Sequence, residues 1–252
     1  MKIAVIGGTG LIGSRLVASL TAHEHDVIAA ARSTGVNSYT GEGLAEALEG
    51  VEVIVDVSNS SYTDEAGALD FFEMSTLNLL TYGAAAGVRH HVALSVVGTD
   101  RLAESEHGYF RAKFVQEQLI KEARVPYSIV HGTQFFEFVK SIANMATDGK
   151  HIRLSHALIQ PMAADDVVTA VERTTVNLPV NGTVEFAGPE RFRIEELIQR
   201  HLTASNDPRQ IVADPLARYF GNRLGEEDLL PGPFAEIAPT HFEDWLTAEV
   251  AA

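Results

Sequence analysis

The sequence contains no cysteine, which excludes disulfide bonds and thiolate metal sites. It also lacks any long apolar run, since none approaches the roughly 18 residues that a membrane-spanning helix requires. The apolar run at the N-terminus ends at Gly7 after about five residues, which is too short for the core of a signal peptide. We therefore expect a soluble, cytoplasmic protein with no membrane partner.

Positive charge is scarce: 19 lysine and arginine residues stand against 34 aspartate and glutamate residues, for a net charge of −15. Such an excess of negative charge opposes direct binding to nucleic acid. The composition is otherwise that of a globular protein, with 46% hydrophobic residues in 252, which is ample for a core. A small molecule is thus the expected partner, and a homodimer is an arrangement that the sequence leaves open.

A glycine-rich motif follows the first apolar run. Ile3–Ile6 has the length of a buried strand, and Leu11–Leu20 is compatible with a helix. Between them, Gly7 permits a sharp turn, Gly10 lets a diphosphate approach the backbone, and Gly13 allows close packing of the helix on the strand. The helix N-terminus would then bind the phosphates. We predict a dinucleotide site here, with these contact residues: Gly7, Thr9, Gly10, Leu11, Ile12 and Gly13.

The residue after the second strand indicates which dinucleotide is bound. Asp26–Ala31 is the predicted strand, and Arg32 and Ser33 follow it. An acidic residue at this point would accept hydrogen bonds from the adenosine ribose of NAD, whereas an arginine matches the 2′-phosphate of NADP. We therefore predict NADP(H) in preference to NAD(H), with Arg32 and Ser33 as ligands; the alternative is a solvated surface arginine.

Strands and helices alternate through the first half of the chain, which indicates an α/β fold. The predicted strands are 51–57, 91–97 and 127–130, and the predicted helices are 44–48, 63–86 and 109–120, with at most a short strand near Val36. If the sheet is doubly wound, Ser58 and Asn59 at the end of strand 51–57 would lie where the cofactor passes, because ligands collect at the carboxyl ends of such strands.

Tyr109 and Lys113 are four residues apart and so share one face of the predicted helix. A lysine ammonium beside a phenol favours the phenolate, and it can also hydrogen-bond the nicotinamide ribose. The phenol can then give or take a proton at a substrate oxygen, and Ser95 could donate a bond to the same oxygen. We predict these three residues to be catalytic; otherwise Tyr109 packs at the start of the helix and Lys113 binds only the cofactor.

The second half of the chain carries fewer chemical signals. His131, Gln134, Phe135 and Phe136 follow strand 127–130 and are candidate substrate contacts, although a buried histidine and an aromatic core are the commoner outcomes. The histidine pairs have no ligand spacing for a metal, so we expect none. Asp165 and Asp166 precede a predicted helix over 167–171, which is a structural placement. A late strand (183–186) and two helices (194–202 and 242–246) are also predicted, around a turn-rich segment over 214–233.

Several segments resemble the atypical short-chain dehydrogenase/reductases, in their NmrA-like branch. They are GGTGLIG at 7–13, Arg32, LSVVG at 94–98, YFRAKFVQEQLI at 109–120, VPYSIV at 125–130, TQFFEF at 133–138 and PMAADDVVTAV at 161–171. The resemblance implies a doubly wound parallel sheet (Rossmann fold) with NADP(H) across the strand C-termini. It also implies one NAD(P)-binding domain over 1–252, in which 1–131 is mainly the dinucleotide core and 132–252 contributes a small substrate lobe and late core elements.

Two departures from the family pattern affect the site. The segment after strand 51–57 is Ser-Asn-Ser-Ser where better-known dehydrogenases have Asn-Asn-Ala-Gly, and His131 stands where this branch often has arginine. We predict an NADPH-dependent oxidoreductase that transfers hydride to or from a small carbonyl, quinone or alcohol. The alternatives are a non-catalytic NADP(H) sensor that binds a protein partner, because the branch includes such regulators, and a sugar-nucleotide epimerase with a retained cofactor.

Overall fold

A computed structural model describes residues 1–60, 64–103 and 108–251. The chain divides into two compact units. Unit 1 comprises residues 1–131 and 167–184, and unit 2 comprises residues 132–166 and 185–252. Unit 1 therefore takes one late segment from the second half of the chain.

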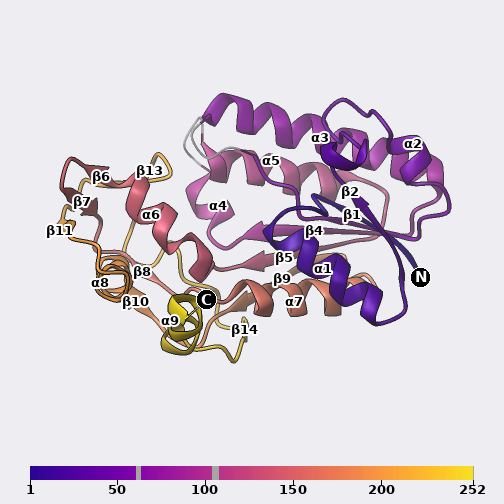
Figure 1. The fold of residues 1–252 in the computed structure, drawn as a ribbon. Helices are drawn as coiled ribbons and strands as arrows, with labels where there is room; N and C mark the ends of the chain where they lie inside the picture. The colour runs from indigo at the N-terminus through magenta and orange to yellow at the C-terminus, as the bar shows by residue number, and fades with distance from the viewer. Residues whose placement is uncertain (61–63, 104–107, 252) are drawn as a thin grey trace. The chain divides into compact units, whose positions relative to one another are not determined.

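A seven-stranded sheet has the strand order β14-β9-β5-β4-β3-β1-β2 (Figure 1). Five strands come from residues 1–132: β1 (Lys2–Ile6), β2 (Asp26–Ala30), β3 (Val53–Asp56), β4 (His90–Val96) and β5 (Tyr127–Gly132). The other two are β9 (Gly182–Ala187) and β14 (Glu236–Ile237). β1 pairs in parallel with both β2 and β3, so the direction of winding reverses there. β3 pairs in parallel with β4, and β9 with β14. The predicted doubly wound parallel sheet is confirmed.

Helices of unit 1 cover both faces of its strands. Figure 1 shows α3 (Glu65–Ala86) and α5 (Tyr109–Glu122) on one side and α1 (Leu11–Ala22) and α7 (Ala164–Val176) on the other. Short helices η1 (Arg32–Thr34), α2 (Leu44–Ala47) and α4 (Thr99–Leu102) lie in the connections. Apolar side chains of the strands pack against those of α2 and α3: Ala4, Ile6, Ile54, Leu44 and Leu79 are all buried. The apolar core of unit 1 therefore lies between this part of the sheet and the helices α2 and α3.

Two predicted elements differ from the structure. No strand forms near Val36 in the described chain, because Gly35, Gly41 and Gly43 have φ of +83°, +83° and +72°, and these left-handed conformations interrupt an extended backbone. Helix α7 begins at Ala164, so Asp165 lies in its first turn instead of before it. The predicted start of α3 at Thr63 lies outside the described residues.

Unit 2 is built from small sheets and short helices. Its sheets are β11-β7-β6, β10-β8 and β12-β13. The strands are β6 (Thr147–Asp148), β7 (His151–Leu154), β8 (Leu158–Ile159), β10 (Phe192–Arg193), β11 (Gln210–Ala213), β12 (Arg218–Tyr219) and β13 (Asn222–Arg223). The helices are η2 (Phe136–Phe138), α6 (Val139–Met145), α8 (Ile194–Ala204) and α9 (Phe242–Ala251). Phe136, Phe242 and Trp245 pack at ring-centroid distances of 5.2 to 5.8 Å and form its aromatic core.

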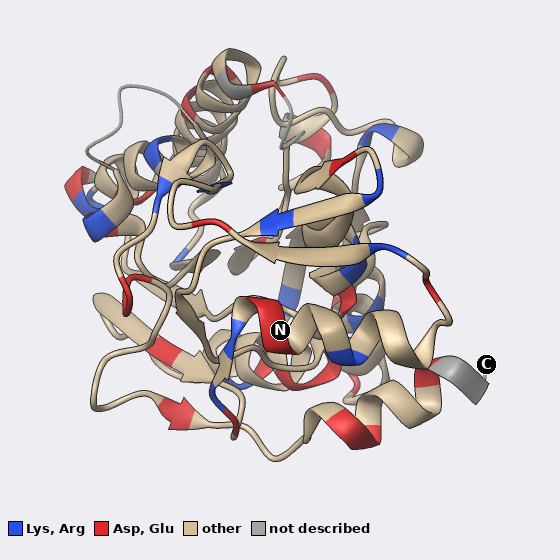
Figure 2. Cartoon of the chain, turned by 90° about the vertical axis from the view of Figure 1, so that its left-hand side faces the viewer, with Lys and Arg blue, Asp and Glu red and all other residues tan. Residues whose placement is uncertain are grey.

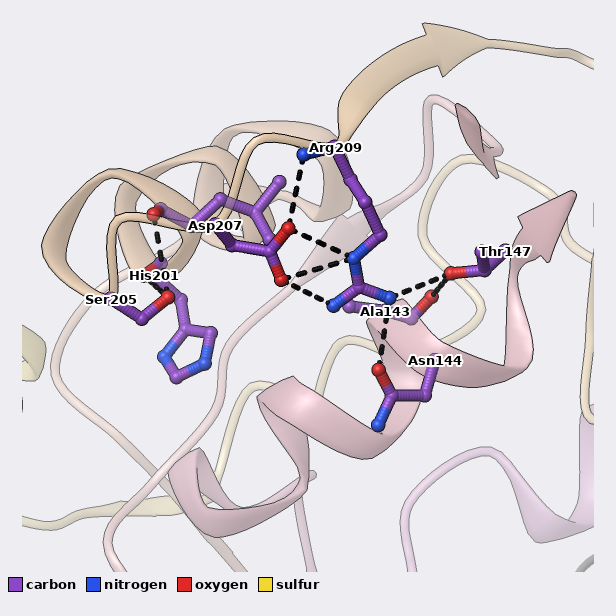
Figure 3. Close-up of polar contacts among 8 residues, drawn as sticks. Ala143, Asn144, Thr147, His201, Ser205, Asp207 and Arg209 are labelled. Carbon is purple, nitrogen blue, oxygen red and sulfur yellow. Dashed lines mark hydrogen bonds and ion pairs between the residues drawn. The ribbon is translucent and has the colours of Figure 1, made fainter. Parts of the chain in front are cut away.

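One arginine joins several elements of unit 2 (Figure 3). The guanidinium of Arg209 donates to both carboxylate oxygens of Asp207, to Asn144 Oδ1 at 2.9 Å and to Thr147 Oγ1 at 2.8 Å. It therefore ties the chain just before β11 to the end of α6 and the start of β6.

The surface carries both signs of charge. Figure 2 shows acidic and basic residues interspersed along helices and strands of the face in view, within the net charge of −15. Among the described residues, no helix is both long enough and apolar enough to cross a membrane.

Candidate functional site

The glycine loop after β1 has backbone geometry that side chains would prevent. Gly7 has φ of +80°, and a Cβ there would lie 2.9 Å from backbone atoms of Ser58. A Cβ on Gly13 would lie 2.1 Å from the carbonyl oxygen of Gly7, so α1 can approach the loop this closely only without a side chain. A Cβ on Gly10 would meet nothing closer than Gly7 O at 3.3 Å, which leaves the outer side of the loop open to a ligand.

Helix α1 begins in this loop without the groups that usually stabilise a helix N-terminus. Gly10 is its N-cap and supplies no side-chain hydrogen bond, and no acidic residue lies in the first turn. The first N–H groups therefore carry uncompensated partial positive charge, which a diphosphate would neutralise. Thr9 and Leu11 are exposed there, whereas the side chain of Ile12 is buried, so only its backbone could contact a ligand. The loop fits a dinucleotide diphosphate.

The predicted 2′-phosphate ligands lie at the end of β2. Arg32 and Ser33 are exposed on η1, and Ser33 Oγ lies 3.4 Å from Thr9 Oγ1 of the glycine loop. Within the residues that the structure describes, the Arg32 guanidinium forms no ion pair with a carboxylate. An arginine at this position without an acidic partner has its charge available for a phosphate.

Ser58 and Asn59 follow β3, as predicted, but Ser58 is anchored by a residue that the sequence analysis did not identify. Asp56 is 1% exposed, and its Oδ1 accepts from the backbone N–H of Ser58 at 2.9 Å and from its hydroxyl at 2.6 Å. Asn59 is exposed, and its Oδ1 accepts from the N–H of Ser60 at 3.1 Å. The turn after β3 is therefore fixed by side-chain hydrogen bonds.

Tyr109 and Lys113 both contact the ring of Phe72. The Tyr109 ring meets it edge-on at 6.1 Å, and Lys113 Nζ lies 4.4 Å from its centroid. Lys113 is 2% exposed and donates to the carbonyl oxygen of Leu94 at 2.8 Å and to Gln116 Oε1. Burial lowers the pKa of Lys113 to about 8, although the charges of Asp56 and Glu117 raise it. The structure thus brings the predicted phenol and ammonium together on one aromatic ring.

Ser95 and His131 meet at Glu117, a second residue that the sequence analysis missed. Glu117 Oε1 lies 2.6 Å from Ser95 Oγ and 2.8 Å from His131 Nε2, and its Oε2 lies 3.1 Å from Lys121 Nζ. Burial alone would raise the pKa of Glu117, but the hydrogen bond and charge of His131, the Ser95 hydroxyl and Lys121 lower it to about 2.

This contact changes the chemistry available to Ser95. An ionised carboxylate only accepts hydrogen bonds, so Ser95 donates its proton to Glu117 and offers only lone pairs elsewhere. In this arrangement the Ser95 hydroxyl donates to Glu117, whereas the predicted role requires it to donate to the reacting oxygen. One signal could have identified Glu117: it lies four residues after Lys113 and therefore on the same face of α5. Gln116, three residues after Lys113, had the same signal.

The remaining predicted substrate residues belong to unit 2. Gln134 is 8% exposed, and within the described residues neither its side-chain nitrogen nor its side-chain oxygen has a hydrogen-bond partner. Its backbone oxygen accepts from Met162 N at 2.9 Å, so the chain itself is fixed. Phe135 stacks on Phe138 at 5.4 Å. Phe136 is 1% exposed in the aromatic core, so packing accounts for it.

Comparison with known proteins gives both relatives and structural neighbours. Two curated proteins, both named photosystem II assembly factor Ycf39, are similar to this chain. The protein from Synechocystis sp. is 25% identical over 236 residues, which cover 86% of this chain and 72% of that protein. The protein from Cyanophora paradoxa is 28% identical over 151 residues, which cover 54% of this chain and only 46% of that protein.

Solved structures share the fold at low identity. A short-chain dehydrogenase/reductase superfamily protein from Agrobacterium tumefaciens with bound NAD has a TM-score of 0.70 and 16% identity, covering 100% of this chain and 96% of its own. RMD from Pseudomonas aeruginosa, complexed with NADPH, has a TM-score of 0.67 and 15% identity, covering 99% and 97%.

The family model described as the NAD dependent epimerase/dehydratase family matches residues 3–133. The match begins in β1, includes the glycine loop, Tyr109 and Lys113, and ends just after β5. The expected membership of the atypical short-chain dehydrogenase/reductases is confirmed, while the NmrA-like branch stays a prediction. By its glycine loop, its parallel sheet and the extent of this match, the chain belongs to the NAD dependent epimerase/dehydratase family.

Proposed function

We propose that the protein is an NADPH-dependent oxidoreductase that transfers hydride to or from a small carbonyl, quinone or alcohol. The observation that carries this proposal is the convergence of Tyr109 and Lys113 on Phe72, in the same unit as a glycine loop that fits a diphosphate. The family supports a nicotinamide cofactor, and Arg32, which has no carboxylate partner among the described residues, supports NADPH.

Each residue has a role that follows from its chemistry. When bound, the cofactor supplies or accepts the hydride. Tyr109 gives a proton to the substrate oxygen during reduction and takes it back during oxidation. Lys113 stabilises the phenolate form of Tyr109 and binds the nicotinamide ribose. His131, held by the Glu117 carboxylate, orients the substrate.

The first test is NADPH consumption by the purified protein across quinones, aldehydes and ketones, with NADH in parallel. We expect turnover with NADPH on at least one of these classes and much slower turnover with NADH. NADPH-dependent turnover would support the proposal, whereas tight NADPH binding without turnover on any class would overturn it.

A second test separates the phenol from the rest of the site. Tyr109→Phe should reduce turnover by roughly 10²- to 10⁴-fold, the usual contribution of a general acid, and should leave NADPH affinity unchanged. Tyr127→Phe is the matched control, because Tyr127 is the first residue of β5 and the predicted site lies at the other ends of the strands. This variant should keep full turnover. Equal turnover of the two variants would exclude a catalytic role for Tyr109.

A second candidate function is an NADP(H)-binding regulator or assembly factor that acts through a protein partner. The name of the two curated relatives favours it, as does the use of the Ser95 proton on Glu117. A redox-sensing regulator must bind NADP⁺ and NADPH with different affinities, because a ligand shifts an equilibrium only by its differential affinity. Unequal affinities without turnover would favour this function.

A further inference from the structure

A chain of buried hydrogen bonds leads from the end of β3 to Lys113. Asp56 uses its two carboxylate oxygens on different partners: Oδ1 accepts from Ser58, and Oδ2 accepts from Gln116 Nε2 at 2.8 Å. Asp56 and Gln116 are each 1% exposed, and Lys113 is 2% exposed. All three side chains are therefore withdrawn from water, where hydrogen bonds are strong and a missing partner is costly.

The orientation of the Gln116 amide follows from this arrangement. A carboxylate only accepts hydrogen bonds, so the amide nitrogen must face Asp56 and the amide oxygen must face the other way. That oxygen accepts from Lys113 Nζ. The ammonium has three donors. Two of them are used on oxygen acceptors, the Leu94 carbonyl oxygen and Gln116 Oε1, which leaves one donor without an oxygen acceptor among the described residues. The nitrogen also lies over the face of the Phe72 ring.

We infer that Asp56 and Gln116 are positioning residues, which hold the Lys113 ammonium at the end of β4 and keep it charged. A buried ammonium without such acceptors would lose its proton, because burial penalises the charged form. Gln116 carries the attraction of the Asp56 carboxylate to Lys113 without a direct ion pair. The inference rests on the proposed function only where it assigns Lys113 to a nicotinamide dinucleotide, because the hydrogen bonds are present without one.

Two other titratable groups lie near Lys113 and Asp56 and are considered in predicting the Lys113 titration. Glu117 lies on α5 beside Lys113 and also favours its charged form. His91 of β4 is buried and interacts with Asp56, and burial lowers the pKa of His91. Neither group is a hydrogen-bond partner of the Lys113 ammonium in the described residues, so variants at Gln116 and Asp56 test the proposed connection specifically.

The direct experiment is an NMR titration of lysine 13Cε shifts in the protein without added cofactor. The chain has only five lysines, at positions 2, 113, 121, 140 and 150, so the Lys113 signal can be assigned by its absence in Lys113→Met. Gln116→Met and Asp56→Asn should each lower the pKa of Lys113 by roughly one unit. Gln118→Met, on the same helix, is the control and should leave it unchanged.

A lower pKa of Lys113 in Asp56→Asn, which keeps the side-chain volume, is not expected from loss of packing alone. If the Lys113 titration is the same in wild type, Gln116→Met and Asp56→Asn, the inference is wrong. If Gln116→Met does not fold, Asp56→Asn, which keeps the side-chain volume, makes the same measurement.

A second measurement connects the positioning to ligand binding. Gln116→Met should weaken NADPH binding about tenfold, equivalent to the loss of roughly one good hydrogen bond. It should not change the affinity for adenosine 2′,5′-bisphosphate, which lacks the nicotinamide ribose. Unchanged NADPH affinity would overturn the inference while leaving the proposed function intact. If neither ligand binds the wild-type protein, the proposed function fails, and the titration still decides whether Asp56 and Gln116 position Lys113.

Discussion

Arg32 tests the cofactor preference at the scale of one residue. Arg32→Ala should weaken NADPH binding by roughly ten- to a hundredfold, because a charge-assisted hydrogen bond contributes about 1.5–3 kcal/mol. NADH has no 2′-phosphate, so its affinity should be the same in both proteins and provides the internal control. Calorimetric titration of both cofactors measures the two effects. An equal loss for NADPH and NADH would show that Arg32 does not recognise the 2′-phosphate.

The Glu117 carboxylate should make the free energy of unfolding depend on pH in the acid range. Its folded-state pKa of about 2 lies below the ordinary value of 4.5, so its contribution is present above pH 4.5 and is lost as the pH falls toward 2. We expect Glu117→Gln to lower the free energy of unfolding at neutral pH by up to about 3 kcal/mol. The difference from wild type should shrink as the pH falls below 4.5.

Urea unfolding measured between neutral pH and pH 3 gives this difference directly. Glu122→Gln is the matched control, because Glu122 is exposed at the end of the same helix. A difference between wild type and Glu117→Gln that stays constant through the acid range would contradict the assignment of Glu117 as a buried carboxylate stabilised by His131 and Ser95.

Gln134 should be a poor contributor to the stability of the free protein. Its amide is buried without hydrogen bonds among the described residues, so Gln134→Met removes a desolvation cost and should leave the free energy of unfolding equal or raise it by about 1 kcal/mol. Gln160→Met is the contrasting variant. Gln160 donates to Gly188 O at 2.8 Å and accepts from Arg191 Nε at 3.0 Å, so its loss should destabilise. Equal destabilisation by both substitutions in thermal unfolding would contradict this prediction.

The residues of the candidate site could be predicted from sequence only where local order specifies them. Tyr109 and Lys113 are about one helical turn apart, and Arg32 lies two residues after the end of β2, so both placements follow from spacing. Asp56 and Gln116 are 60 positions apart, and their contact exists only because β3 and α5 pack in the folded unit. Likewise, the proton of Ser95 could not be assigned before its distance to Glu117 was known.

At the scale of the element, Arg209 should stabilise the β11-β7-β6 sheet through its fixed geometry. The pKa of Asp207 falls to about 2, first because of its side-chain hydrogen bonds with Arg209 (Figure 3). Lysine cannot reproduce this set of donors. Arg209→Lys should lower the melting temperature by a few degrees and speed amide exchange in β11.

The control for this prediction is Arg200→Lys. Arg200 of α8 pairs at the surface with Glu196 of the same helix and with Glu243 of α9, and surface ion pairs contribute little. Amide exchange in β11 that is equally slow in both variants would show that Arg209 does not stabilise this sheet.

Most elements of unit 1 were predictable, and the short strands of unit 2 were not. β1, β4, α3 and α5 have enough residues for their apolar pattern to exceed chance. β7 alternates exposed and buried residues correctly for a strand, but over only four positions, and β6, β8 and β10 have two residues each. Such short strands depend on pairing with distant segments, which a local pattern does not contain.

At the scale of the whole molecule, the two units are not successive stretches of the chain. Unit 1 is completed by residues 167–184, which follow 35 residues assigned to unit 2 (132–166). Within unit 1, Glu172 of α7 accepts from Ser19 Oγ of α1 at 2.6 Å and lies 2.7 Å from His23 Nδ1. Residue 131 is therefore the end of the first segment of unit 1, and unit 1 as a whole is not one continuous stretch of chain.

This interrupted order matters while the protein is being made. A ribosome that has translated the glycine loop, Tyr109 and Lys113 has not yet produced α7, the helix that packs on α1. Folding of unit 1 therefore cannot be completed until residue 184 of 252 has emerged from the ribosome. A pause in translation between residues 131 and 167 would leave unit 1 without α7 and would expose the apolar surface that this helix covers, a condition that favours aggregation.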